Sequence, residues 1–396
     1  MTTTFETLGV SSDLTTALKK RGITEPFDIQ EMSIPDGLDG HDICGKAKTG
    51  SGKTLAFGLP LLERVDVADP HHPRGLVLVP TRELANQVAD ELRPLAEVVD
   101  RTITAVYGGV SIDPQIDRLE DGVDVVVGTP GRLIDLIERR ELSVSDVSVL
   151  VLDEADRMAD MGFMPQVQKI LRGIESPHQT LLYSATLDRA VNQLVDRYME
   201  DPVFHEVESA EVTVDAMEHL FLHVHQMDKV KVAAAISESA YRTLIFVRTK
   251  RGADRLVRQL QRDGVKAGAI HGDLRQAARE RALKQFSSGK LPVLVATDVA
   301  ARGIHVDDID VVVHYDPAED AKQYLHRSGR TARAGETGVA VTLCLWDQEN
   351  DVRFLQRRLG LSLPMTEIFS NDERLHDLHA WASGSPATTD EPERTG

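Results

Sequence analysis

Short apolar runs alternate with longer stretches of helical spacing along most of the chain. In the first half, the runs are rich in branched aliphatic residues and stop at turn-forming residues, as buried strands do. These runs lie at 42–44, 75–79, 102–107, 123–127, 148–152 and 180–183. The stretch from Glu83 to Ala96 has the spacing of an amphipathic helix. Such alternation indicates an α/β fold with a parallel sheet and right-handed crossovers.

The alternation stops near Asp201-Pro202, where proline interrupts the helical pattern, and it resumes after an acidic, weakly periodic segment. The second series of apolar runs lies at 243–247, 267–270, 292–296, 309–314 and 338–345. The sequence therefore predicts two tandem α/β domains, at 1–205 and 219–370, joined by a linker at 206–218. The acidic segment 371–396 is expected to be a tail without folded structure.

Composition supports two domains but adds a complication of charge. A chain of 396 residues with 41% apolar content exceeds one domain of roughly 100–200 residues. The formal charge of 45 − 63 = −18 is unusual for a protein that binds nucleic acid, because neutralising phosphates needs lysine and arginine. A local basic surface can coexist with an acidic exterior. A host with a salt-rich cytoplasm and ordinary acidity are both open explanations, and the salt optimum of activity separates them.

The two cysteines, Cys44 and Cys344, lie in apolar runs in different halves of the chain. This placement favours buried structural thiols over a disulfide or a metal cluster. No apolar run approaches the length of a membrane-spanning helix. The N-terminal residues lack a basic region followed by an apolar one, so no signal peptide is expected. The expected location is the cytoplasm.

Residues 47–54, Ala-Lys-Thr-Gly-Ser-Gly-Lys-Thr, fit a phosphate-binding loop in which Ala47 stands at the usual first glycine. Gly50 and Gly52 allow the backbone to curl until its N–H groups converge on phosphate oxygens. The following helix points its N-terminus at the same anion. Lys53 supplies a charge for the β- and γ-phosphates, and Thr54 supplies a hydroxyl for Mg²⁺. A chance glycine turn is the alternative, and the Gly-Lys-Thr sequence disfavours it.

The apolar run 148–152 ends in an acidic sequence, Asp153-Glu154-Ala155-Asp156. Parallel sheets place ligand chemistry at the carboxyl ends of their strands. Asp153 is expected to hold Mg²⁺ through water, and Glu154 to polarise the attacking water. An acidic pair after a strand is by itself more often a helix N-cap. The phosphate loop upstream favours the catalytic interpretation.

These two motifs, AKTGSGKT and DEAD, resemble those of the DEAD-box helicases of superfamily 2. The resemblance covers residues 5–345, because further segments match the family's motifs in order. The matching segments are Pro80–Ala85, Gly108-Gly109, Thr129–Arg132, Ser184–Thr186, 297–304 and 326–333. The resemblance implies two tandem RecA-like domains, each a mostly parallel sheet flanked by helices. It also implies an ATP-dependent RNA helicase that acts as a monomer.

The resemblance assigns ATP and Mg²⁺ as cofactors and gives residues for each role. Nucleotide contacts are implied for Phe5, Gln30, Thr49, Gly50, Ser51, Gly52, Lys53, Thr54, Gly303 and His305. Catalytic roles are implied for Lys53, Asp153, Glu154, Arg330 and Arg333, with Thr54 and Asp153 toward the metal. The two arginines would act as fingers on the γ-phosphate. The Gln30 carboxamide both donates and accepts, so it can match the adenine edge.

RNA is the implied partner, alone or in RNA–protein complexes. RNA contacts are implied for Pro80, Thr81, Arg82, Gly109, Thr129, Arg132, Arg279 and Thr297. Ser184, Thr186 and His326 would couple the ATP state to strand separation. Hydroxyls, turn N–H groups and guanidinium forks hold phosphates and do not read base edges, so binding should be sequence-tolerant. In the implied mechanism, ATP and one RNA strand bridge both domains, and closure bends that strand and opens short duplexes.

Some positions depart from the family pattern. Ile23 replaces the usual adenine-stacking aromatic residue, and Phe27 and Asp28 replace Thr and Pro. Adenine packing is therefore expected to be weaker. His305 replaces an aspartate that contacts the ribose, so His305→Asp is expected to lower the KM for ATP. Ala332 replaces a common glycine and is expected to be tolerated.

Other functions stay open at this point. An RNA clamp without useful unwinding, or a DNA helicase, would share the same motifs. A metabolic phosphate-loop kinase would not need a second α/β domain with paired arginines. A metal site at His219, His223 and His225 is disfavoured, because their spacing fits a strand with alternating exposure equally well.

Overall fold

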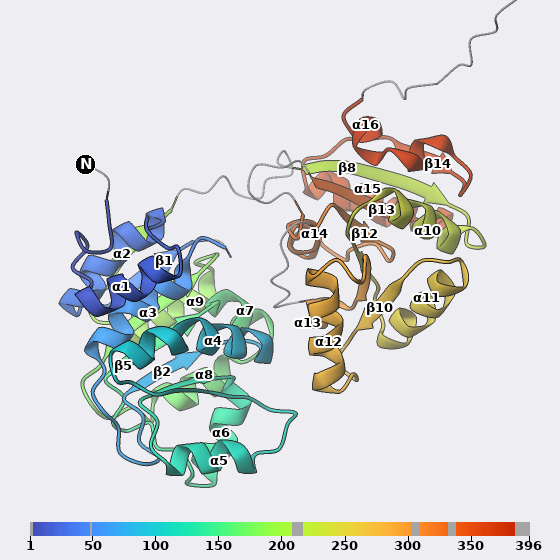
Figure 1. Cartoon of the computed structure of the whole chain (residues 1–396). Helices are drawn as coiled ribbons and strands as arrows, with labels where there is room; N and C mark the ends of the chain where they lie inside the picture. Colours follow the sequence, from blue (N-terminus) through green and yellow to red (C-terminus); the bar gives the residue numbers. More distant parts are fainter. Residues whose placement is uncertain (1–2, 48–49, 208–216, 302–308, 332–337, 385–396) are drawn as a thin grey trace, which may run out of the picture. The chain divides into compact units, whose positions relative to one another are not determined.

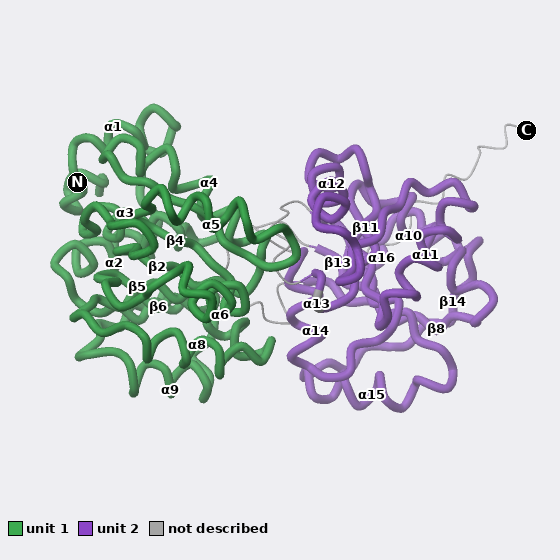
Figure 2. Tube along the Cα trace, turned by 90° about the horizontal axis from the view of Figure 1, so that it is seen from below, with its two compact units in different colours: residues 1–209 green, residues 210–396 purple. Residues whose placement is uncertain are grey.

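The computed structural model describes residues 3–47, 50–207, 217–301, 309–331 and 338–384. The chain forms two compact units, 1–209 and 210–396, each with its own sheet (Figures 1 and 2). We describe each unit by itself. No helix in the described residues combines the length and apolar character that a bilayer span requires.

Unit 1 contains a seven-stranded sheet in the order β3-β4-β2-β5-β6-β1-β7. Each neighbouring pair is parallel. The strands are β1 (Ile43–Lys46), β2 (Gly75–Leu78), β3 (Ile103–Val106), β4 (Val125–Gly128), β5 (Val149–Asp153), β6 (Gln179–Ser184) and β7 (Val203–Glu206). The helices are α1 (Ser12–Lys20), α2 (Asp28–Asp39), α3 (Lys53–Arg64), α4 (Arg82–Val98), α5 (Asp113–Glu120), α6 (Pro130–Glu138), α7 (Ala155–Asp160), α8 (Met164–Leu171) and α9 (Arg189–Tyr198).

Unit 2 contains a second seven-stranded parallel sheet, in the order β10-β11-β9-β12-β13-β8-β14. Its strands are β8 (Met217–Val224), β9 (Thr243–Phe246), β10 (Ala267–Ile270), β11 (Val293–Ala296), β12 (Val311–His314), β13 (Gly338–Cys344) and β14 (Met365–Ile368). The helices are α10 (Lys229–Ser239), α11 (Lys250–Arg262), α12 (Gln276–Ser287), α13 (Asp298–Ala301), α14 (Ala321–Ser328), α15 (Glu349–Arg358) and α16 (Leu378–Ala382), with 3₁₀ turns η2 (Trp346–Gln348) and η3 (Glu373–His376).

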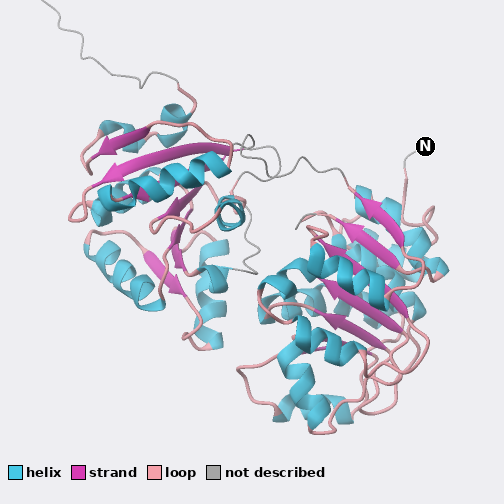
Figure 3. Ribbon diagram, turned by 180° about the vertical axis from the view of Figure 1, so that it is seen from behind, coloured by secondary structure: helices cyan, strands magenta, loops and turns pink. Residues whose placement is uncertain are grey.

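Both sheets have the same topology. Counted within its own unit, each sheet runs third, fourth, second, fifth, sixth, first and seventh strand. Helices cover both faces of each sheet (Figure 3), so the central strands are buried on both sides. This explains their continuous aliphatic runs. The expected fold of tandem RecA-like domains is confirmed, and the parallel pairing places the carboxyl ends of the strands of each sheet at one edge.

Three strands were not assigned from the sequence. β7 and β14 lie at sheet edges, and only Ile368 of their eight residues is buried, so they lack a strong apolar run. Of the three histidines considered above as a metal site, His219 and His223 lie in β8, which pairs with β13 and β14, and His225 follows the end of the strand. Within β8, the His219 Nδ1 lies 2.8 Å from the Tyr324 hydroxyl, and the His223 ring stacks on Trp346. These two side chains are held by packing within unit 2.

The expected unstructured tail is wrong over residues 371–384, which form η3 and α16. Leu375 and Leu378 are buried in the core of unit 2. Ser370, just before this segment, donates its backbone N–H and its hydroxyl to the Asp228 carboxylate at 2.7 and 2.9 Å. The acidic composition averaged over the segment concealed these apolar anchors.

Both cysteines are free and buried, as expected. Burial raises the pKa of the Cys44 thiol to about 11. It raises the pKa of the Cys344 thiol to about 12, with nearby Lys229 opposing. Neither thiol is therefore ionised near neutral pH, and neither has the character of a nucleophile.

Candidate active site

The phosphate loop connects β1 to α3 at the carboxyl edge of the unit 1 sheet. Gly50 and Gly52 have φ values of 89° and 82°, a left-handed conformation that favours glycine. Lys53 begins α3 and is buried, and its ammonium donates to the Ala47 carbonyl at 3.1 Å across the loop. The Lys53 ammonium therefore lies at the N-terminus of α3, where a bound anion would replace its contact with the Ala47 carbonyl. Ser51 lies between the two glycines, and Thr49 lies outside the described residues.

Gln30 joins the phosphate loop to the segment before α2. Its Oε1 accepts from the Phe27 backbone N–H at 2.9 Å, and its Nε2 donates to the Gly52 carbonyl at 2.8 Å. A Cβ at position 52 would lie 2.3 Å from Nε2, so only glycine allows this approach. Gln30 therefore lies against the loop, as a nucleotide-reading residue requires.

A pocket of about 360 Å³ opens beside this carboxamide. Its lining residues are Gly22, Ile23, Thr24, Glu25, Phe27, Gln30, Gly52, Leu55 and Glu91. Apolar walls and one carboxamide suit a planar heterocycle. Phe5, expected to contact the nucleotide, is instead buried in the core of unit 1 and does not line the pocket.

Glu91 of α4 is a pocket residue that sequence reasoning missed. Burial raises the pKa of its carboxyl group, and a hydrogen bond with the Thr54 side chain partly opposes this shift. Thr54 is thereby placed next to an acidic group from a different helix. A single sequence carries no signal for this contact, because α3 and α4 come together only in the fold.

The acidic motif follows β5 at the same edge. Asp153 is buried, and burial holds the pKa of its carboxyl group well above the ordinary value of 3.8, with the Lys53 ammonium opposing the shift. Its Oδ1 is buried and has no hydrogen-bond partner among the described residues. A buried acceptor without a donor is costly unless a ligand completes it. This atom and the Thr54 hydroxyl are the donor types that Mg²⁺ prefers.

Glu154 has a left-handed backbone conformation that is unusual for a residue with a Cβ. Its φ is 53° and its ψ is 49°, which costs of order 1 kcal/mol or more. Glu154 is the single residue between the end of β5 and the start of α7, so it belongs to neither element. Its Oε2 accepts from Arg157 at 2.6 Å. Strain held by a surrounding core often marks functional positions.

Asp156 connects the acidic motif to the Ser184–Thr186 segment. Its Oδ2 accepts from the Thr186 backbone N–H and hydroxyl, both at 3.2 Å. The Ser184 hydroxyl accepts from the Asp156 N–H at 3.2 Å and donates to the Thr186 carbonyl at 2.7 Å. Two of the predicted coupling residues are therefore bound to the motif that follows β5. Asp156 itself was not assigned a role from the sequence.

The predicted RNA-contact residues of unit 1 gather after β2, β3 and β4. Pro80 is buried, and Thr81 caps α4 by accepting from the Leu84 N–H at 3.3 Å. Arg82 lies over Gly109, where a Cβ would be 2.0 Å from its guanidinium. Thr129 is at the N-cap of α6 without a side-chain capping bond.

Arg132 extends from α6 to the same place. Its Nη2 donates to the Val110 carbonyl at 3.0 Å, and its buried Nη1 has no partner among the described residues. The positive charge of Arg82 is close enough to lower the pKa of Arg132, although burial is the larger cause. Two guanidinium groups in the first turns of two helices have the charge and hydrogen-bond donors that complement phosphate groups.

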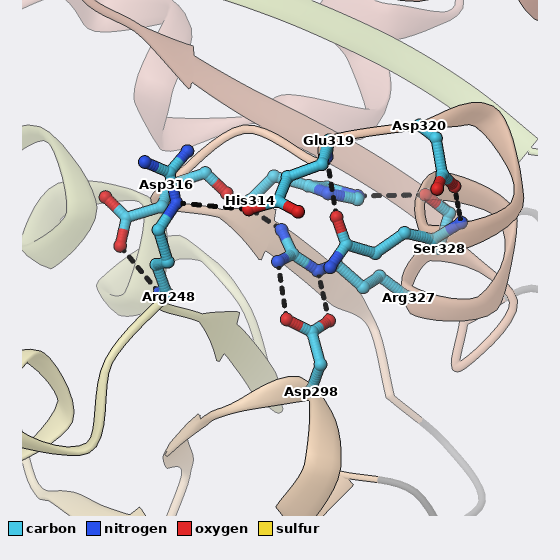
Figure 4. A network of polar contacts seen from close by, with 9 residues as sticks. Arg248, Asp298, His314, Asp316, Glu319, Asp320, Arg327 and Ser328 are labelled. Atoms are coloured by element: carbon cyan, nitrogen blue, oxygen red, sulfur yellow. Dashed lines mark hydrogen bonds and ion pairs between the residues drawn. The ribbon is translucent and has the colours of Figure 1, made fainter. Parts of the chain in front are cut away.

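In unit 2, a partly buried ion pair joins the described parts of the 297–304 and 326–333 segments. Arg327 of α14 donates from Nε and Nη2 to the two Asp298 oxygens, at 2.6 and 2.8 Å (Figure 4). Its Nη1 donates to the Asp316 carbonyl at 2.8 Å. Arg327 and Asp298 had no role assigned from the sequence. Arg330 follows three residues later, where it is buried and its backbone N–H donates to the Arg327 carbonyl at 3.2 Å.

The other predicted residues of unit 2 occupy the same edge or its flank. Thr297 follows β11, and its N–H donates to the Ile270 carbonyl at 3.3 Å. Arg279 of α12 donates to the Ala300 carbonyl at 3.1 Å, which places it beside α13. His326 is exposed on α14. Gly303, His305 and Arg333 lie outside the described residues.

Comparisons with known families cover both units. Residues 27–194 match the family model of the DEAD/DEAH box helicases, and residues 226–335 match the helicase conserved C-terminal domain. The DEAD-box ATP-dependent RNA helicase CshA of Bacillus licheniformis is 41% identical over 377 residues, covering 95% of this chain and 77% of that protein. The ATP-dependent RNA helicase CshA of Listeria monocytogenes is 42% identical over 342 residues, covering 86% and 66%.

Two solved structures also align with this chain over more than nine tenths of its length. Dbp5 of S. cerevisiae bound to RNA and ADP BeF3 aligns with a TM-score of 0.77 at 30% identity, covering 93% of this chain and 96% of that chain. A DEAD box protein from the hyperthermophile Methanococcus jannaschii is 36% identical with a TM-score of 0.50, covering 92% and 99%.

Proposed function

This chain belongs to the DEAD-box family of ATP-dependent RNA helicases, and we propose that it separates short RNA duplexes locally or remodels RNA–protein complexes as it hydrolyses ATP. The observation that carries the proposal is the convergence of Lys53, Asp153 and Glu154 at one sheet edge. Lys53 and Asp153 are buried and electrostatically linked, and the Asp153 Oδ1 lacks a donor among the described residues. We propose that the enzyme acts in the cytoplasm as a monomer.

Residues of unit 1 bind ATP and position the attacking water, and two arginines of unit 2 act on the γ-phosphate. Gln30 and the pocket beside it bind the adenine, and the phosphate loop with Lys53 binds the β- and γ-phosphates. Thr54 and Asp153 would hold Mg²⁺, which supplies neutralising charge on the phosphates. Glu154 orients the attacking water and accepts its proton. Arg330 and Arg333 stabilise the charge that develops on the γ-phosphate.

RNA is held by its backbone in this proposal. Arg82 and Arg132 contact phosphates beside Gly109 and Thr129 in unit 1, and Arg279 and Thr297 do so in unit 2. Because ATP and RNA each contact both units, each favours the binding of the other. Loss of the γ-phosphate releases Arg330. The contacts of Asp156 with Ser184 and Thr186 then transmit this change to the RNA site, and the RNA strand dissociates.

Lys53→Ala and Glu154→Gln test the function. Each is expected to lower RNA-stimulated ATP turnover by at least about 100-fold, because a phosphate cation or the general base is lost. Phosphate release is measured with and without single-stranded RNA, and Glu154→Gln is expected to keep ATP binding. Turnover at the wild-type rate in either folded variant would overturn the proposal.

A duplex-release assay with ATP separates a helicase from an RNA clamp, which would bind RNA without releasing strands. Matched RNA and DNA strands then separate an RNA enzyme from a DNA helicase. We expect stimulation of ATP turnover by RNA to exceed stimulation by DNA, since a 2′-hydroxyl can distinguish them.

A further inference from the structure

Helix α11 of unit 2 carries a stripe of four arginines, Arg251, Arg255, Arg258 and Arg262. Their spacing of four, three and four residues places them on one face of the helix. All four are exposed, and the stripe extends over about 16 Å at 1.5 Å per residue. None of these residues has a predicted role in the ATP or RNA site described above. We call this set the α11 stripe.

The α11 stripe forms no ion pair within the part of the chain that the structure describes. Among the described residues, none of its four guanidinium groups lies within ion-pair distance of a carboxylate. The acidic residue of the same helix, Asp254, is instead within 3.0 Å of the His271 Nε2. Three other exposed arginines do have carboxylate partners, namely Arg93 with Asp90, Arg139 with Asp135 and Arg353 with Glu349. Arg189 of α9 and Arg281 of α12 are exposed without such a partner in the described part of the chain.

An unpaired stripe works against helix stability, because like charges at these spacings repel each other. It is also a local reversal of sign in a chain with a net charge of −18. Folding of unit 2 does not require it, since the buried face of α11 is formed by Ala253, Leu256 and Leu260. A polyanion is the ligand that this arrangement complements.

The stripe begins at the edge where unit 2 holds its predicted RNA contacts. Thr249 caps α11 by accepting from the Gly252 N–H at 3.0 Å. Asp254 reaches His271, directly after β10, and the last residue of β10 accepts from the Thr297 N–H at 3.3 Å. From this edge, α11 runs along the flank of β10 (Figure 1). An RNA strand that continues from Thr297 past β10 toward α11 would therefore meet the stripe.

We propose that the α11 stripe binds the phosphate backbone of RNA that extends beyond the segment held at the Arg279 and Thr297 edge. This inference rests on the proposed RNA helicase function and adds a second contact region to it. Guanidinium groups bind phosphate bidentately and do not read base edges from a helix surface in this way, so the contact is sequence-tolerant. Its contribution depends on RNA length and on salt.

The test compares two full-length triple variants with the same change in charge. R255Q/R258Q/R262Q removes the part of the stripe farthest from the Thr297 edge, and R93Q/R139Q/R353Q removes three exposed but paired arginines. Glutamine and arginine have similar helix propensities, so both variants should fold. Affinity is measured by fluorescence anisotropy on single-stranded RNAs of graded length, over a series of salt concentrations.

We expect R255Q/R258Q/R262Q to lose affinity for long strands only, by about 10-fold or more. The slope of log affinity against log salt should become shallower by about 2, since each phosphate contact contributes about 0.7 on single strands. The control variant should match the wild type. R255K/R258K/R262K, which keeps the charge, should recover most of the affinity.

Other outcomes are equally informative. Wild-type affinity of R255Q/R258Q/R262Q for long strands overturns the stripe as an RNA contact, and so does a loss that is the same at every length. An equal loss in R93Q/R139Q/R353Q would assign the effect to net charge and also overturn it. RNA-stimulated ATP turnover of the wild type is measured in parallel. Its absence would mean failure of the proposed function, whereas its presence with an unaffected stripe variant would mean failure of the stripe alone.

Discussion

At the scale of single residues, the adenine pocket contains an aromatic side chain at position 27 instead of at position 23. The sequence places Ile23 where an aromatic residue is usual in this family, which suggests weaker adenine packing. The structure shows that Phe27, itself a departure, lines the same pocket and is 60% exposed. A Cβ on Gly52 would lie 2.6 Å from the Phe27 ring, so this aromatic side chain lies against the phosphate loop. Phe27 is therefore positioned to pack on the nucleotide in place of the residue at 23.

Phe27→Ala is expected to raise the KM for ATP by about 10-fold, since an aromatic contact of 1–1.5 kcal/mol is lost. Ile23→Ala should have a smaller effect, because its shorter side chain covers less of the base. Steady-state ATP turnover at saturating RNA measures both, with kcat expected to change little. Phe369→Ala, an exposed phenylalanine of unit 2, is the matched control. A larger effect at Ile23 than at Phe27 would return the packing role to position 23.

At the scale of elements, β12 and α14 are joined by buried polar contacts around His314. The His314 Nε2 lies 2.9 Å from the Ser328 hydroxyl (Figure 4). The His314 ring stacks on Tyr324 with centroids 4.5 Å apart. Burial lowers the pKa of His314 well below its ordinary value of 6.5, and the charges of Arg327 and His219 add to the shift. Neutral His314 therefore holds the helix that carries Arg327 and precedes Arg330.

The stability of unit 2 is expected to fall as the pH drops below 6.5. In that range the unfolded chain binds a proton at His314 and the folded chain does not, so protons favour unfolding. The loss approaches about 1.4 kcal/mol per pH unit until the lowered pKa is reached. Both tryptophans, Trp346 and Trp381, are in unit 2, so their fluorescence during urea unfolding reports on this unit.

His314→Asn should unfold more easily at pH 8 but lose less stability between pH 8 and pH 5 than the wild type. His225→Asn, at an exposed position of the same unit, should keep the wild-type pH dependence. An unchanged pH dependence in His314→Asn would mean that another group is responsible.

At the scale of the whole molecule, the net charge of −18 affects stability and RNA binding, and added salt should change these two properties in opposite directions. Repulsion among surface carboxylates destabilises the compact state, and salt screens it over a Debye length of about 8–10 Å near physiological ionic strength. The proposed phosphate contacts of Arg82, Arg132 and the α11 stripe should weaken in salt, because RNA binding releases counterions.

Thermal unfolding temperature is therefore expected to rise between about 0.05 and 1 M KCl, while RNA affinity falls over the same range. Differential scanning fluorimetry and anisotropy titrations on one protein preparation measure both. An unfolding temperature that falls with salt would contradict the charge argument. ATP turnover with saturating RNA then separates the two explanations of the acidity. An optimum near 0.1 M favours ordinary acidity, and a much higher optimum favours a salt-rich host.

The sequence by itself determined the family, the α/β class and the phosphate and acidic motifs, together with most strands of both sheets. Aliphatic runs, glycines and short motifs such as 47–54 and 153–156 are local signals, so neighbouring residues suffice to identify them. The edge strands β7 and β14 escaped because only one of their eight residues, Ile368, is buried. The ordered segment at 371–384 escaped because a few buried leucines anchor an otherwise polar sequence.

Only the tertiary structure decided which distant residues meet. It placed Glu91 beside Thr54, Arg82 over Gly109 and Arg327 on Asp298. In the structure, Phe5 is buried in the core of unit 1, and Phe27 lines the pocket. It also left the α11 stripe without an ion pair among the residues that the structure describes, although acidic residues outnumber basic ones in the chain. Each of these contacts depends on strand order and helix packing, which bring together residues that no local pattern relates.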